Sequence, residues 1–300
     1  MDPDDSTLMR FWKDACAVTA SASLRVLPGA VVFGLWAGVV YLIQRFTPHD
    51  VSIELGPHEV AGALLGILLV LRTNAGYDRW WEARKAWGGI VNQSRNLAIT
   101  ALSCGPADPV WRQQIVRWTI AFAFAARSRL RGEATAPELE TLLGKKAADA
   151  VAASVHGPTW ISLHIAALLN EGCTRHGMDR IAFLEASRAR ATLIDHLGTC
   201  ERILNTPLPR VYAISIRRFI VLFLGSLPFA LLHKLEADWL TPLLTMVVAF
   251  PILDLDQIGI ELQNPFSTHS LSHLPLDTIC ATIERNLMGM LTTESVSRDP

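Results

Sequence analysis

The 300-residue sequence is poor in charge. Only 18% of its residues are Asp, Glu, Lys or Arg, against about 25% in an ordinary globular protein. The formal net charge is −1, which excludes a chain made basic overall for binding nucleic acid. Half of the residues are hydrophobic, and the mean hydropathy is +0.28. This composition excludes a disordered or collagen-like chain and favours an integral membrane protein with a substantial water-facing part.

Cysteine is also scarce. The five cysteines, Cys16, Cys104, Cys173, Cys200 and Cys280, form no CxxC pair. Their spacing fits a reducing compartment and argues against a zinc knuckle or a disulfide framework. The first five residues are acidic overall, whereas a secretion signal begins with basic residues, so no cleaved leader is expected.

The common catalytic motifs are missing as well. The sequence contains no Gly-rich phosphate loop, no HExxH, no GxSxG and no DxDxDG. His156 and His164 lie near Ser154 and Ser162, but no acidic residue close in sequence is placed to orient either imidazole. Packing within a helical region explains these residues better than catalysis does. We therefore expect a protein that is not an enzyme and that needs no cofactor.

Long uncharged runs are what the sequence does contain. Residues 26–43 hold eighteen residues without a charge, close to the roughly 20 that cross a bilayer as a helix. Three shorter apolar segments lie at 60–71, 219–232 and 239–253. Each of the three alone is compatible with a buried core helix, but as a set they favour four transmembrane helices over one span and a soluble domain.

The distribution of charge predicts the topology. Residues 72–218 hold 20 Lys and Arg against 12 Asp and Glu, and the rest of the chain holds 7 against 16. The positive-inside bias places this segment, and with four spans both termini, on the cytoplasmic side of the plasma membrane. Breaker-poor runs at 110–131 and 180–204 predict helices within it. We therefore predict an all-α multi-pass protein with four segments: an N-terminal helix and two spans (1–71), a helical cytoplasmic region (72–218), two spans (219–253) and a C-terminal cytoplasmic segment (254–300).

The second predicted span carries two patterns. Gly62 and Gly66 share one helical face, where another backbone can approach closely. Ala63, Ile67 and Leu71 form a nearly straight apolar stripe on an adjacent face. The stripe either packs against lipid or a neighbouring helix, or, with several copies around an axis, lines a dry constriction that gates ions by dewetting.

The run that follows carries a family resemblance. Residues 71–88 read Leu-Arg-Thr-Asn-Ala-Gly-Tyr-Asp-Arg-Trp-Trp-Glu-Ala-Arg-Lys-Ala-Trp-Gly, which resembles the signature of the bestrophin ion channels, prokaryotic members included. Further matches follow in order over about residues 8–291, at 200–209, 226–229, 263–266 (Gln-Asn-Pro-Phe), 274–277 and 282–287. Single tripeptides are weak signals, but the ordered set, placed on spans inferred independently, is specific.

The resemblance implies a homopentamer around an axial pore, with a hydrophobic neck made by the second span. It places the neck on Ala63, Ile67 and Leu71, and a second constriction, in the cytoplasmic region, on Ile181. The function it implies is passage of monovalent ions, most often chloride or other anions. The partners are then further copies of the chain, membrane lipids and the permeant ions.

The resemblance also concerns two residues that would support the neck, and the sequence departs from the family pattern at two places. Arg72 and Asn74 at the foot of the neck would anchor it, through charge and backbone hydrogen bonds. Ala63 stands where family members carry a larger apolar residue, which shifts the seal to the other neck positions. The stretch 267–273 lacks the acidic cluster that holds calcium in eukaryotic members, so calcium activation by that route is not expected.

Two alternatives share the predicted architecture. A hydrophobic neck carries no charge code, so a sodium channel fits the same pattern, and a pentamer with a blocked neck would be a non-conducting membrane scaffold.

The run Arg-Ser-Arg-Leu-Arg at 127–131 either binds anionic lipid headgroups or is a helix end that faces solvent or a subunit partner.

Overall fold

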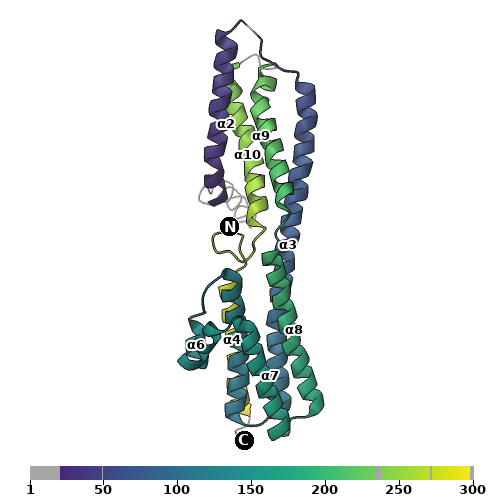
Figure 1. The fold of residues 1–300 in the computed structure, drawn as a ribbon, viewed down its shortest axis with the longest axis vertical. Helices are drawn as coiled ribbons and strands as arrows, with labels where there is room; N and C mark the ends of the chain where they lie inside the picture. The colour runs from purple at the N-terminus through teal and green to yellow at the C-terminus, as the bar shows by residue number, and fades with distance from the viewer. Residues whose placement is uncertain (1–20, 49, 234–237, 271, 298–300) are drawn as a thin grey trace, which may run out of the picture. The chain divides into compact units, whose positions relative to one another are not determined.

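The computed structural model describes residues 21–48, 50–233, 238–270 and 272–297, and helices dominate them (Figure 1). The predicted all-α class is confirmed for these ranges. The N-terminal helix expected ahead of the first span falls on residues outside the described ranges.

Among the described residues, four helices are long and apolar enough to cross a membrane, as the sequence predicted. They are α2 (Ser21–Phe46), α3 (Leu55–Cys104), α9 (Arg210–Leu232) and α10 (Thr241–Glu261), the last preceded by the short 3-10 turn η1 (Asp238–Leu240). The chain is therefore a membrane protein. Helix α3 does not end with the predicted span at Leu71 but runs on to Cys104.

Packing divides the chain into two units. The membrane unit comprises the described residues within 1–80, 207–264 and 269–272, and the second unit comprises the described residues within 81–206, 265–268 and 273–300. Helix α3 contributes its first part to the membrane unit and the remainder to the second unit. These units group residues by how they pack. The predicted segment boundaries at 71/72, 218/219 and 253/254 instead mark where the chain enters or leaves the membrane. The units do not test these boundaries, which stay predictions.

The membrane unit is a bundle in which α2 packs along α10 and both contact α9 (Figure 1). Its core is made of apolar side chains from all four helices, most of them small or branched: Ala30, Leu65, Leu69, Ile216, Ile220, Phe223, Leu224, Leu227 and Ala249. Each helix thus packs one side within the chain, and many apolar side chains elsewhere on these helices remain exposed.

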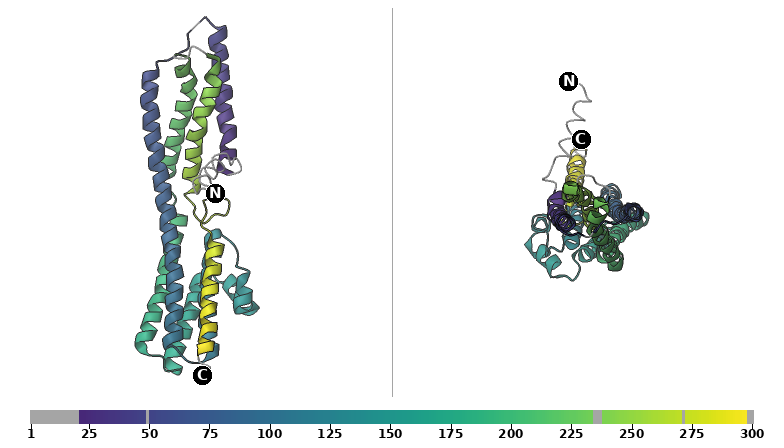
Figure 2. Two further views of the ribbon diagram at one scale, coloured as in Figure 1. Left: turned by 180° about the vertical axis from the view of Figure 1, so that it is seen from behind. Right: turned by 90° about the horizontal axis from the view of Figure 1, so that it is seen from above.

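The second unit is built around α4 (Pro109–Arg131), whose side chains are buried over most of its length. Asp108 caps the first turn of α4 by accepting the Val110 N–H at 2.9 Å, and Gly132 ends it with φ 72°. Around α4 lie α5 (Glu138–Leu143), α7 (Gly157–Arg175), α8 (Arg180–Asn205) and α11 (Leu276–Ser297), and α6 (Lys145–Ala153) joins α5 to α7. Helix α11, yellow in Figure 2, lies along α4. The helices predicted at 110–131 and 180–204 are confirmed to within one residue at each end.

Candidate functional site

The apolar stripe of α3 points away from the core of its own unit. Ile67 and Leu71 are 59% and 54% exposed, and Ala63 is exposed as well. Leu65 and Leu69, on the opposite side of the helix, are buried in the core. The stripe is therefore free to contact something outside this chain.

The two glycines beside the stripe have different surroundings. A Cβ at Gly62 would lie 3.2 Å from the Phe223 ring of α9, so this glycine makes room for packing within the chain. Around Gly66, apart from its chain neighbours and the adjoining backbone of its own helix, no described atom lies within 4 Å of where a Cβ would be. Only Gly66 therefore leaves open space for the approach of another copy.

At the foot of the stripe, Arg72 is almost fully buried, with 1% of its side chain exposed. Its guanidinium donates to the carboxylate of Asp256 on α10, and the same carboxylate accepts from Arg217 Nε of α9 at 3.3 Å. Within the described ranges, the Nε and Nη2 atoms of Arg72 have no hydrogen-bond partner. A charge pair, rather than a backbone hydrogen bond, thus ties α3 to α9 and α10. Asn74 is exposed.

Ile181 lies in the second unit, in the first turn of α8, and is 72% exposed. Asp179 caps that turn: one carboxylate oxygen accepts the Ile181 N–H at 2.8 Å and the Ala182 N–H at 3.2 Å. The core-facing residues of α8 begin one turn later, at Ala186. The structure thus leaves Ile181, like the α3 stripe, out of the core of its own chain.

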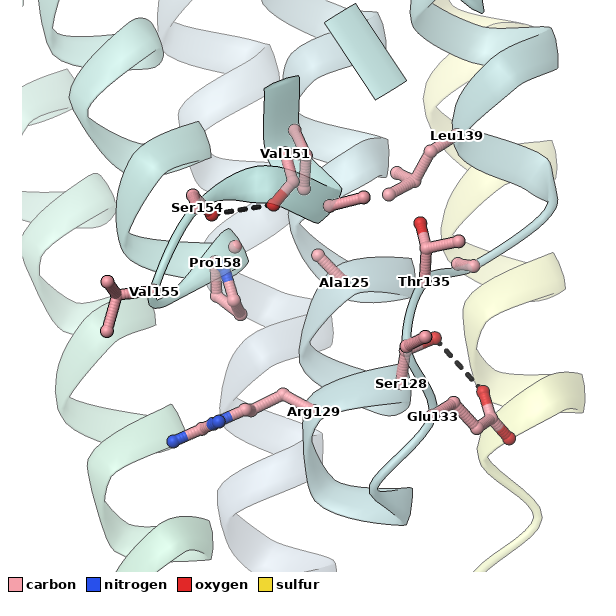
Figure 3. A pocket seen from close by; sticks show the side chains of 14 residues that line it. Ala125, Ser128, Arg129, Glu133, Thr135, Leu139, Val151, Ser154, Val155 and Pro158 are labelled. Atoms are coloured by element: carbon pink, nitrogen blue, oxygen red, sulfur yellow. Dashed lines mark hydrogen bonds between the residues drawn. The ribbon is translucent and has the colours of Figure 1, made fainter. Parts of the chain in front are cut away.

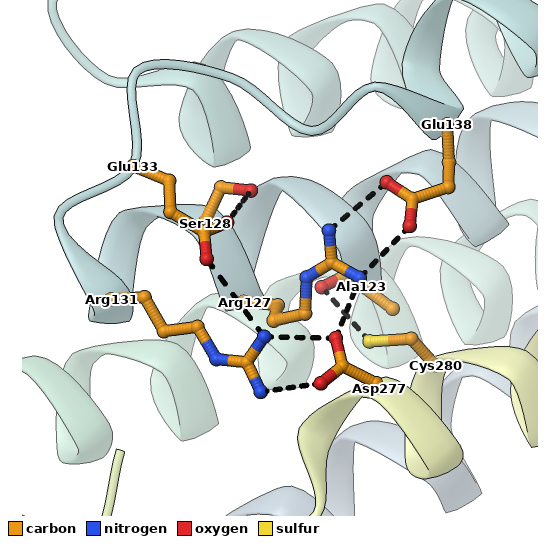
Figure 4. A network of polar contacts seen from close by, with 8 residues as sticks. All are labelled: Ala123, Arg127, Ser128, Arg131, Glu133, Glu138, Asp277 and Cys280. Atoms are coloured by element: carbon orange, nitrogen blue, oxygen red, sulfur yellow. Dashed lines mark hydrogen bonds and ion pairs between the residues drawn. The ribbon is translucent and has the colours of Figure 1, made fainter. Parts of the chain in front are cut away.

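The arginine run at 127–131 turns inward, unlike both interpretations of the sequence (Figure 4). Arg127 and Arg131 are 6% and 8% exposed. Both donate to Asp277 at the start of α11, at 3.0 Å and 2.8 Å, and Arg127 also pairs with Glu138 through two 3.0 Å hydrogen bonds. Only Arg129, 52% exposed, remains at the surface, where it pairs with Glu201.

These ion pairs shift the pKa values of the two carboxyl groups. Hydrogen bonding and charge from Arg131, together with the charge of Arg127, lower the pKa of Asp277 against a smaller effect of burial. At Glu138, burial raises the pKa, but the hydrogen bonds and charge of Arg127 outweigh it and the net shift is downward. One turn beyond Asp277, burial raises the pKa of the Cys280 thiol to about 12. The network therefore holds the start of α11 against α4 through ionised carboxylates.

His156, one of the two histidines considered for catalysis, has a structural role. An acid far away in sequence does orient His156: Glu201 Oε1, 45 residues along the chain, lies 2.7 Å from Nε2. The other ring nitrogen, Nδ1, accepts the Thr159 N–H at 3.2 Å and caps α7. The Ser154 hydroxyl donates to the Val151 carbonyl, and no hydrogen bond joins it to His156.

A cavity beside these residues is small (Figure 3). Its volume is about 100 Å³, and its charged lining groups are already engaged, because Glu133 accepts from Ser128 and Arg129 pairs with Glu201. In the part of the chain that the structure describes, no three His, Cys, Asp or Glu side chains are arranged to hold a metal ion. The exposed stripe of α3, with the buried charge pair at its foot, is the strongest candidate site.

Comparison with known proteins shows what the chain as a whole is similar to. Residues 4–289 match the family model described as Bacterial/Fungal Bestrophin protein. The "Voltage-dependent anion channel-forming protein" of Nostoc sp. is 35% identical over 260 residues, which cover 85% of this chain and 82% of that protein. The protein of the same name in Synechocystis sp. is also 35% identical, over 81% of this chain and 80% of that protein.

A solved structure has the same fold. The crystal structure of a bacterial bestrophin homolog from Klebsiella pneumoniae superposes with a TM-score of 0.80 and is 28% identical in sequence. The match covers 90% of this chain and 98% of that one.

Proposed function

The chain belongs to the bestrophin family, and from that membership, which makes it a channel protein and not an enzyme, we propose that it forms a homopentameric pore for monovalent ions. Chloride and other anions are the ions that pass most readily. The pore needs no cofactor, and the passage of ions through it is driven by the electrochemical gradient alone.

One observation carries the proposal: α3 presents Ala63, Ile67 and Leu71 away from its own core. Five copies around an axis turn this stripe into an apolar ring, and an ion that enters such a ring must shed water without compensation. Ile67 and Leu71 form the gate, since Ala63 leaves its level wide. Gly66 lets neighbouring α3 helices approach, and the buried Arg72 fixes the foot of each helix. Ile181 narrows the cytoplasmic end.

The anion preference is supported by two facts. The relatives from Nostoc and Synechocystis are named as anion channel-forming proteins. The segment 72–218, with 20 basic against 12 acidic residues, favours anions in a cytoplasmic vestibule. The same bias supports a plasma-membrane orientation with both termini in the cytoplasm and with segments at 1–71, 72–218, 219–253 and 254–300.

A salt gradient across a planar bilayer tests the ion. With purified protein, the reversal potential should lie toward the chloride equilibrium potential. A value toward the sodium equilibrium potential would make the protein a cation channel of the same architecture. Absence of current would leave the non-conducting scaffold.

Alanine substitution tests the gate. Ile67→Ala or Leu71→Ala in every subunit should widen and wet the ring, so conductance or open probability rises substantially. Folding should change little, because these side chains pack little within the chain. Leu35→Ala is the matched control: Leu35 is 68% exposed on α2, which does not line the proposed neck. Assembled Ile67→Ala and Leu71→Ala channels that conduct like the parent would place the gate elsewhere.

A further inference from the structure

Ile181 is part of a longer exposed face of α8. Leu184, Glu185 and Arg188 follow it at intervals of three, four and seven residues, which places all four side chains on one side of the helix. Each of them is exposed, and Leu184 is 47% exposed although it is apolar. The buried residues of α8, including Ala186, Ala189 and Leu193, lie on other sides of the helix. The face that carries Ile181 is therefore unused by its own chain.

The charges on this face neutralise each other. Arg188 Nη1 lies 2.5 Å from Glu185 Oε1, and the two side chains are 64% and 54% exposed. Of the charged residues just ahead of Ile181, Asp179 is held by the backbone N–H groups that it caps. Arg180 precedes Ile181 by one residue and so points about 100° away around the helix. Beside Ile181, the face thus carries one carboxylate and one guanidinium in contact.

We propose that the Glu185–Arg188 ion pair sets the charge selectivity of the cytoplasmic constriction by keeping the passage beside Ile181 electrically neutral. The inference rests on the proposed function, in which five copies of Ile181 surround the axis. Five copies of the pair then form a ring with no net charge. Removal of one member converts this ring into five like charges, and rings of charged side chains select ions of the opposite sign.

The test uses two single variants with opposite expected results. Glu185→Gln leaves five guanidiniums and should raise the chloride-to-sodium permeability ratio roughly severalfold, and Arg188→Gln leaves five carboxylates and should lower it by a similar factor. Both ratios come from reversal potentials of full-length channels in a planar bilayer under a salt gradient. An exposed pair at this helical spacing contributes little to folding, so both variants should fold.

Two controls keep the result specific. The exchanged pair Glu185→Arg with Arg188→Glu restores a neutral ring and should restore the parent reversal potential. Glu171→Gln and Arg175→Gln break a comparable exposed pair at the end of α7, with an N–O distance of 3.2 Å, and should leave the potential unchanged.

The outcomes separate the inference from the proposed function. Opposite shifts for the two α8 variants, with unchanged α7 controls, support the inference. A parent that conducts, while Glu185→Gln and Arg188→Gln leave its reversal potential unchanged or shift it in one direction, overturns the inference alone. A parent that passes no current overturns the proposed function and the inference with it.

Discussion

At the scale of single residues, the buried charge pair is the feature most sensitive to mutation. Asp256→Asn removes the carboxylate that Arg72 needs and leaves a guanidinium with 1% exposure uncompensated. Loss of one partner from a buried ion pair costs about 3–5 kcal/mol, so the variant should unfold at a clearly lower temperature in detergent. Arg217→Gln is the control, because Arg217 is 53% exposed and shares the same carboxylate. Equal melting temperatures for Asp256→Asn and the parent would show that the pair contributes nothing to stability.

The sequence predicted one half of this pair and missed the other. Arg72 was expected at the foot of the neck because it follows the second apolar span directly. Its partner lies 184 residues further along the chain, and local pattern analysis does not detect so distant a contact. A signal was nevertheless present, since Asp256 follows the last apolar span closely, and an ionisable residue so near the membrane interior usually has a partner there. The exposure of Ile67, Leu71 and Ile181 also needed coordinates, because spacing alone does not say which face a helix buries.

At the scale of helices, prediction was most accurate where capping residues and breakers mark the ends. Asp108, Pro109 and Gly132 bound α4, and Asp179 caps the start of α8; both helices were located to within one residue. Helix α3 was underestimated because the charges after Leu71 mark the predicted end of the apolar span and not the end of the helix. Ala, Arg, Lys and Glu in the run 82–86 have good helix propensity and carry it onward.

The docking of α11 depends on an ionised Asp277. Asp277→Asn removes the charge that Arg127 and Arg131 share and should loosen the start of the helix. The cost should be about 1 kcal/mol or less, because Asp277 is 63% exposed and its ion pairs are screened. The pKa of Asp277 is lower in the folded chain than its unfolded value of about 3.9. The stabilisation that Asp277 contributes is therefore complete above the unfolded pKa, and it is lost as the pH falls through the pKa of the folded chain.

Cysteine labelling measures this loosening. Cys280 is fully buried one turn beyond Asp277, and its pKa of about 12 leaves little thiolate near neutral pH. Maleimide should therefore label it only when α11 leaves α4, and faster in Asp277→Asn than in the parent, as mass spectrometry of digested peptides can show. Cys200 on α8 is the internal control, since it is equally buried with a pKa of about 12. Equal labelling rates at Cys280 in both proteins would contradict a role for Asp277 in docking.

At the scale of the whole molecule, the question is what covers the exposed apolar surface of the chain. Side chains on the outer face of α3, such as Val60, Leu64 and Val70, are more than half exposed together with Ile67 and Leu71. Lipid can cover part of this face, but the open space at Gly66 favours a neighbouring helix. A closed ring covers the same face on every subunit, and a ring of identical chains has no uncovered end.

The assembly should therefore have a mass near five times the 33.0 kDa chain, measured by light scattering in detergent with the micelle subtracted. Gly66→Leu places a bulky side chain where neighbouring α3 helices approach and should shift the mass toward smaller species. Gly38→Leu on α2 is matched to it, because a Cβ at Gly38 also meets no described atom within 4 Å beyond its own stretch of helix, and this variant should keep the parent mass. Intact folding of both variants is expected, since neither leucine meets its own chain at the Cβ. A parent that is a monodisperse monomer or dimer would exclude the axial pore. A pentameric Gly66→Leu would mean that α3 contacts its neighbours through another face.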